Sequence, residues 1–321
     1  MGTKHWVLVL LAASAPIAKA DSQPGFLVSI TAHSTGPLNA PLDVAHLQDG
    51  NGVTVVSINE REVYLFSTSG DYQLTTYLGF NPDRITTTDI GKLLTIDSFD
   101  NRVFVLEEDG TFIARWGKCG EEPGQFRIIR DIAWGPDGLV YVADSDRIQR
   151  FTIEGDFQDE WSVPAIIRSL LVAPDGSIYS LSWIDRTVEK YDPSGALLKT
   201  ISEADFALEK PFEPVDLAME STGKLHIVDL ANQRVHVVDE ALVHQYSWGR
   251  SGQGPDEFQE PYRIAISETD LIAVADWGQP KVMLFQANES TSVQLVTWGT
   301  LKRMGTTQDF GKRASVSFRK P

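Results

Sequence analysis

Residues 138–151 read "GLVYVADSDRIQRF", which is an apolar run, a short acidic turn and a second apolar run. The same arrangement returns as "KLLTIDSFDNRVFVL" at residues 92–106 and as "KLHIVDLANQRVHVV" at residues 224–238. Runs of β-branched and aromatic residues bounded by Gly, Asn and Asp are typical of short strands joined by tight turns. The chain therefore repeats a β-hairpin.

The residue that ends the first apolar run gives the period of this repeat. A third short run precedes each hairpin and a fourth follows it, as in "DIAWG" at 131–135 and "FIARWG" at 112–117. Four short strands per unit are typical of a β-propeller, in which neighbouring sheets bury each other's faces. We expect an all-β fold, a six-bladed β-propeller of four-stranded antiparallel blades, as one domain over residues 21–300. The six period-defining residues, 38 to 47 positions apart, are Ser57, Asp97, Asp144, Ser182, Asp229 and Asp276.

The strand that closes the ring of blades is left open by the sequence. Residues 25–33, "GFLVSITAH", form an extra strand candidate before the first full copy. Residues 293–298, "VQLVTW", form another candidate after the last copy. One of the two completes the sixth blade and the other is an addition.

Residues 120–151, "GEEPGQFRIIRDIAWGPDGLVYVADSDRIQRF", resemble an NHL repeat: a Gly-rich lead-in, a Phe, a strand, Pro-Asp-Gly and two further strands. The lead-in recurs as "WGRSGQGPDEF" at 248–258 and as "WGTLKRMGTTQDF" at 298–310. The similarity covers residues 41–300 and implies an exported, bacterial-type six-bladed NHL propeller. Some propellers of the wider group are lyases, such as the streptogramin lyase, with metal-binding or acid–base histidines near the axis. His46 lies three residues into a first strand, but no matching ligand set accompanies it, so no catalytic residue, metal or cofactor is carried over.

The two chain ends differ from the repeats. Residues 1–20, "MGTKHWVLVLLAASAPIAKA", have the basic start, apolar middle and small-residue end of a secretory signal peptide, which predicts a secreted or periplasmic protein. Residues 301–321 form a basic tail. The net charge of −16 disfavours nucleic acid and anionic membranes as partners, and we expect a monomer without integral membrane association. Cys119 is the one cysteine, so no internal disulfide can form.

The repeated Asp at the strand end predicts a structural role. An Asp at this position can accept hydrogen bonds from turn N–H groups that have no strand partner. Four copies spread around a ring are not needed for catalysis. We interpret Asp97, Asp144, Asp229 and Asp276 as turn fasteners.

A second set of aligned residues opens the first strand of each copy. The first strand of a propeller blade is innermost, so these side chains should meet at one mouth of the central channel. Mixed charges there could orient a polar ligand. The alternating signs favour a different interpretation, a ring of salt bridges that seals the channel. The candidate ligand-binding residues, called the channel ring below, are Asp43, Arg84, Asp131, Ser169, Asp216 and Arg263.

The lead-in loops should lie on the same face as the channel ring. Their acidic and aromatic residues suit a protein or peptide partner, whereas Phe126 and Phe258 recur in register and are predicted to wedge between blades. The sequence therefore predicts an exported binding or scaffold module without catalysis, which recognises a peptide, protein or glycan through this face. The alternative is a metal-dependent lyase or hydrolase at the channel mouth, built on Asp43, Asp131 and Asp216.

Overall fold

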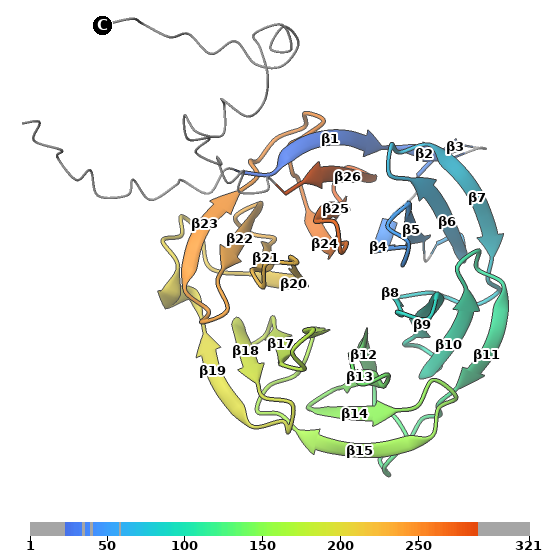
Figure 1. The fold of residues 1–321 in the computed structure, drawn as a ribbon. Coiled ribbons are helices and arrows are strands. Elements are labelled where there is room, and N and C mark those ends of the chain that lie inside the picture. Colours follow the sequence, from blue (N-terminus) through green and yellow to red (C-terminus); the bar gives the residue numbers. More distant parts are fainter. Residues whose placement is uncertain (1–22, 34–35, 39–40, 58, 288–321) are drawn as a thin grey trace, which may run out of the picture. The chain divides into compact units, whose positions relative to one another are not determined.

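Six four-stranded antiparallel sheets stand around a central axis in the computed structural model, which describes residues 23–33, 36–38, 41–57 and 59–287 (Figure 1). The predicted six-bladed all-β propeller is confirmed. The predicted signal peptide, the tail 301–321 and the strand candidate 293–298 lie outside the described residues. Within the described part of the chain, no helix is long and apolar enough to cross a bilayer, and the one helical element is a short 3-10 turn, η1 (Glu203–Asp205).

Each blade runs outward from its innermost strand in chain order. Blade 1 comprises β4 (Pro41–His46), β5 (Gly52–Ser57), β6 (Glu62–Ser67) and β7 (Tyr72–Tyr77). Blade 2 comprises β8 (Arg84–Thr87), β9 (Lys92–Asp97), β10 (Arg102–Glu107) and β11 (Phe112–Trp116). Blade 3 comprises β12 (Ile129–Trp134), β13 (Val140–Asp144), β14 (Arg147–Phe151) and β15 (Phe157–Ser162). Blade 4 comprises β16 (Ser169–Val172), β17 (Ile178–Ser182), β18 (Thr187–Tyr191) and β19 (Leu197–Ile201). Blade 5 comprises β20 (Pro214–Met219), β21 (Leu225–Asp229), β22 (Arg234–Val238) and β23 (His244–Trp248). Blade 6 comprises β24 (Pro261–Ile266), β25 (Leu271–Asp276), β26 (Lys281–Gln286) and, from the other end of the chain, β1 (Gly25–Ile30).

The ring of blades is closed by β1. This strand pairs antiparallel with β26, from Gly25 opposite Gln286 to Ile30 opposite Val282, and Figure 1 shows the two side by side. The "GFLVSI" part of the first strand candidate is therefore the outermost strand of blade 6. Residues 32–33 of the same stretch instead form β2 (Ala32–His33), which pairs with β3 (Gly36–Pro37).

Burial explains why the sequence folds this way. Every residue of β13 is buried, because the second strand of a blade is covered on both faces by neighbouring blades, whereas β15 at the outer edge alternates between half-buried and exposed. The apolar clusters lie between adjacent blades. Phe126 and Phe258 are fully buried in two of these clusters, as the wedge interpretation predicted, and their lead-in chains form isolated bridges with Cys119 and Ser251.

Two kinds of loop define the two ends of the channel. In blade 3 the start of β12 pairs with the end of β13, Ile129 opposite Asp144, so the lead-in to the first strand and the turn after the second strand lie at the same end. We call this end the loop face. The turns between first and second strands lie at the other end, which we call the opposite face.

Candidate functional site

The structure brings all six members of the channel ring together at the start of the innermost strands. Five are buried and the side chain of Arg84 is 12% exposed. The three acids lie on blades 1, 3 and 5, and Arg84, Ser169 and Arg263 lie on blades 2, 4 and 6.

Each acid of the ring holds the next blade. Asp43 Oδ2 accepts a hydrogen bond of 2.8 Å from the backbone N–H of Ile85 in blade 2. Equivalent bonds reach Asp131 Oδ2 from Leu170 N–H in blade 4 (2.7 Å) and Asp216 Oδ2 from Ile264 N–H in blade 6 (2.8 Å). The sequence alignment placed these acids correctly but did not reveal that each one reaches across a blade boundary.

The remaining blade boundaries are bridged by the side chains of the even-numbered blades. Arg84 Nε lies 3.6 Å from Asp131 Oδ1, and Ser169 Oγ donates a 2.8 Å hydrogen bond to Asp216 Oδ1. Arg263 Nε lies 3.8 Å from Asp43 Oδ1. Acid-to-backbone and side-chain-to-acid contacts therefore alternate around a closed circuit of six blades. This geometry favours the sealing interpretation, and a ligand-binding role for the ring stays a prediction.

The electrostatics of the ring follow from burial and from its composition. Burial raises the pKa of Asp43 to about 7 against the attraction of Arg263 and Arg84, and burial also raises the pKa of Asp131. Arg84 Nε and two nitrogens of Arg263, Nε and Nη2, are buried without a hydrogen-bond partner among the described residues. The ring therefore retains buried donors that water or another polar group must satisfy.

A group of aromatic and cationic side chains covers the ring from the loop face. The Arg168 guanidinium of blade 4 lies 4.9 Å from the ring centroid of Tyr262 in blade 6 and 5.5 Å from that of Trp183. The Tyr262 ring lies 5.3 Å from that of Trp277 and 4.5 Å from the Arg263 guanidinium. Because blade 5 lies between blades 4 and 6, these contacts cross one side of the channel mouth.

Sequence reasoning named the aromatic residues of the lead-in loops but missed those of the turns after the second strands. Phe99, Trp183 and Trp277 lie in the turns after the second strands of blades 2, 4 and 6 and are 75%, 48% and 47% exposed. A usable signal was present, since each occupies the first or second position after the period-defining residue. Four acids of the lead-in loops were predicted to be available to a partner. Asp256 and Glu257 pair with Arg250, whereas Glu121 and Glu122 are exposed.

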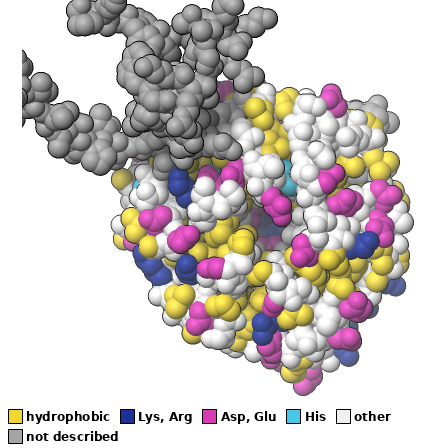
Figure 2. Space-filling view, viewed as in Figure 1, with side chains coloured by type: hydrophobic (Ala, Val, Ile, Leu, Met, Phe, Trp, Pro, Cys, Tyr) yellow, Lys and Arg dark blue, Asp and Glu magenta, His cyan; other side chains and the backbone are white. Residues whose placement is uncertain are grey.

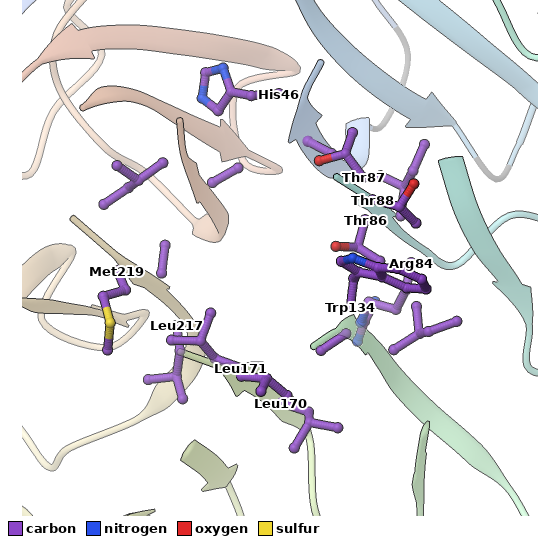
Figure 3. A pocket seen from close by; sticks show the side chains of 18 of the residues that line it. His46, Arg84, Thr86, Thr87, Thr88, Trp134, Leu170, Leu171, Leu217 and Met219 are labelled. Carbon is purple, nitrogen blue, oxygen red and sulfur yellow. The ribbon is translucent and has the colours of Figure 1, made fainter. Parts of the chain in front are cut away.

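On the other side of the channel ring lies a cavity of about 460 Å³. Figure 2 shows a hollow at the centre of the blades, and Figure 3 shows the side chains around the cavity. The acids and Arg84 of the ring line its inner end, and residues next to the turns of the opposite face, such as Gln48 and Glu268, line its outer end. In the part of the chain that the structure describes, no group of three or more His, Cys, Asp or Glu side chains is arranged to hold a metal ion.

The turn Asp residues have the structural contacts that their repetition predicted. Asp144 Oδ1 accepts 2.8 Å hydrogen bonds from the N–H groups of Arg127 and Ile128 in the lead-in loop, and its Oδ2 accepts one from Arg147 Nε. Asp97 accepts from two N–H groups of its own turn, those of Phe99 and Asp100. These carboxylates therefore fasten both the turn and the lead-in that crosses it.

Comparison with known proteins supports this fold. A family model described as a 6-bladed beta-propeller matches residues 73–192. The chain is similar to a solved streptogramin B lyase structure (TM-score 0.59, 12% identity, covering 80% of this chain and 96% of that one). It is also similar to virginiamycin B lyase from Staphylococcus aureus (TM-score 0.55, 15% identity, 76% and 79% covered). A third similar structure is a protein of unknown function from Bacteroides thetaiotaomicron (TM-score 0.63, 17% identity, 82% and 72% covered).

At these identities the structural likeness shows the fold alone. The sequence has no significant match among curated proteins. The chain is thus a six-bladed β-propeller, and the narrower assignment to NHL repeats stays a prediction.

Proposed function

We propose that this protein is an exported binding module that recognises a protein or peptide partner through its loop face. The observation that carries the proposal is the exposed aromatic side chain in the same turn of blades 2, 4 and 6: Phe99, Trp183 and Trp277. Large aromatic side chains that are already exposed and held on a rigid frame contribute much of the energy in protein interfaces.

The neighbouring residues favour a protein or peptide over a glycan. Ile128, Ile166 and Ile184 are at least 40% exposed on the loop face and extend its apolar area. A hydroxyl-rich sugar would lose hydration against this aliphatic surface without gaining hydrogen bonds, whereas apolar side chains of a partner would be buried favourably. Charged groups such as Asp146 and Arg186 lie among these residues and supply the polar rim that protein interfaces have.

The channel ring and the apolar clusters between blades hold the turns of the loop face in fixed positions. Propeller loops project from blades that the channel ring and the interblade clusters hold in place, so the exposed turns are presented with little loss of conformational entropy on binding. The signal-peptide pattern of residues 1–20 supports a secreted or periplasmic location. The partner would therefore be another exported or surface-displayed protein.

Affinity capture with a double variant tests the proposal. Wild-type protein, Trp183→Ala/Trp277→Ala and the control Tyr77→Ala, whose side chain is 65% exposed on the outer strand β7, are used as baits on the exported fraction of the source cells. We expect at least one protein to be enriched by wild type and control but not by the double variant, and to bind purified wild type in calorimetry. If every enriched protein binds the double variant equally, the loop face is not the binding surface.

A further inference from the structure

The central channel is closed at the loop face and accessible from the opposite face. The cavity is lined by the channel-ring residues Asp43, Arg84, Asp131, Ser169 and Asp216, but not by residues that precede them, such as Arg130 or Tyr262. The ring therefore forms its inner end. At the outer end, Trp134 Nε1 donates a 2.8 Å hydrogen bond to Asp89 Oδ1, so part of the rim is a hydrogen-bonded structure rather than loose side chains.

The walls of the cavity have two chemically different sides. Figure 3 shows Leu170, Leu171, Leu217 and Met219 from blades 4 and 5 along one side. The other side has Thr86 and Thr87, together with Arg84 and Trp134, from blades 2 and 3. The Thr88 hydroxyl beside them is buried and bonded to the Lys92 backbone. Leu171, Met219, Thr86 and Trp134 are each partly exposed in the channel, so a bound molecule would reach both sides.

Three buried side-chain nitrogens next to these walls lack a hydrogen-bond partner among the described residues. Neither ring nitrogen of His46, which is 5% exposed, has a partner, and Arg84 Nε has only its 3.6 Å ion-pair contact with Asp131. Burial lowers the pKa of His46 to about 4; the Ala265 carbonyl opposes this shift weakly without meeting hydrogen-bond geometry. His46 is thus neutral at physiological pH, and its two ring nitrogens are not accessible to solvent.

The charge of the cavity restricts its ligand. An anionic head group would face the three carboxylates of the ring, a cationic one would lie beside Arg84, and the desolvation of either would add to the cost. An uncharged molecule avoids these costs, and its hydrogen-bonding edge can meet the partly exposed Thr86 and Thr87. The volume of about 460 Å³ lies within the usual range of small-molecule sites.

From these observations we infer that the channel is a blind pocket for an uncharged small molecule that has an apolar face and a hydrogen-bonding edge, and that enters from the opposite face. This inference is independent of the proposed function, because the two sites lie on different sides of the channel ring. It requires only that the apolar face of the ligand packs on the leucines of blades 4 and 5 while its polar edge meets Thr86 and Thr87.

Titration with Nile red, an uncharged apolar fluorophore with a carbonyl acceptor, tests the pocket. We expect saturable binding of one probe per chain to the wild type. Leu171→Trp should fill the cavity and weaken binding by about tenfold or more. Leu198→Trp is the matched control, since it makes the same change in the same blade on the outer strand β19, where the side chain is 57% exposed, and it should leave binding unchanged.

Further variants separate the pocket from other surfaces. Met219→Trp fills the cavity from blade 5, and circular dichroism and thermal melting show whether each filling variant is folded. Trp183→Ala/Trp277→Ala should bind the probe as the wild type does. The inference is overturned if binding does not saturate, if a folded filling variant binds as tightly as the wild type, or if the loop-face variant loses binding.

Discussion

Removal of the Asp144 carboxylate should destabilise the propeller, because this buried side chain holds the lead-in loop of blade 3 to the turn after β13. The side chain is fully buried and accepts hydrogen bonds from two lead-in N–H groups, from Arg147 Nε at 2.8 Å and from Gln149 Nε2 at 3.2 Å. In Asp144→Ala the two part-buried N–H groups lose their acceptor at about 1 kcal/mol each, and the loss of the charge-assisted bond to Arg147 adds about 1 kcal/mol. The expected loss of about 3 kcal/mol lowers the melting temperature by about 6 to 12 °C for a domain of this size.

The matched control for this prediction is Asp146→Ala, two residues along the same turn. Asp146 forms an exposed ion pair with Arg127, and its loss should change stability by about 0.5 kcal/mol or less. Calorimetry of both variants compares the two values directly. Melting temperatures that fall equally in the two variants would refute the fastener role of the buried carboxylate.

Further predictions concern the channel ring, its closure and metal binding. Folding raises the pKa of Asp43 from 3.8 to about 7, so the stabilisation from its protonated form is complete below pH 4 and is lost as the pH rises toward 7. In Asp43→Asn the free energy of unfolding in urea should therefore depend less steeply on pH over this range. A slope equal to that of the wild type would contradict the raised pKa. Arg263→Ala leaves Asp43 without its nearest cation and should lower the melting temperature, whereas loss of ligand binding without a change in stability would support the ligand role of the ring. Deletion of residues 21–31 removes β1 and exposes the edge of β26, so light scattering should show association and calorimetry a lower melting temperature. Elemental mass spectrometry of protein purified without chelator should find no stoichiometric zinc or calcium, and about one metal per chain, lost with EDTA together with stability, would favour the lyase or hydrolase alternative.

The repeat made the blade architecture and the membership of the channel ring accessible from the sequence. Aligned copies place equivalent residues at equivalent points of successive blades, so Asp43 and Asp131 could be assigned to one ring without coordinates. Alignment does not say how far a side chain reaches, because this depends on the rotamer and on the rotation between blades. The hydrogen bond from the Ile85 N–H to Asp43 therefore could not be predicted from the sequence, and neither could the position of Arg168 over the Tyr262 ring.

Variation between copies concealed the loop-face aromatics for a different reason. Trp183 stands where two other copies have a serine, Ser98 and Ser145, and such variation resembles ordinary turn divergence. Only burial separates a packed aromatic such as Phe126 from an exposed one such as Trp277. The choice of strand to close the ring was similarly undecidable, because both candidate stretches have the composition of an outer strand.

The alternation of acids and donors in the channel ring has a physical basis that the individual blades do not reveal. Six buried carboxylates would repel one another, and six arginines would leave the N–H groups of Ile85, Leu170 and Ile264 without acceptors. An acid in every second blade satisfies these N–H groups of the following blade and also provides a partner for the donor of the preceding blade. Ser169 occupies one donor place without a charge, so three carboxylates face two guanidinium groups. Burial is the main cause of the raised pKa of Asp43, and repulsion from Asp216 and Asp131 adds to it. Ser169 completes the hydrogen-bonded circuit but has no positive charge, so it leaves the third carboxylate of the ring without a compensating cation.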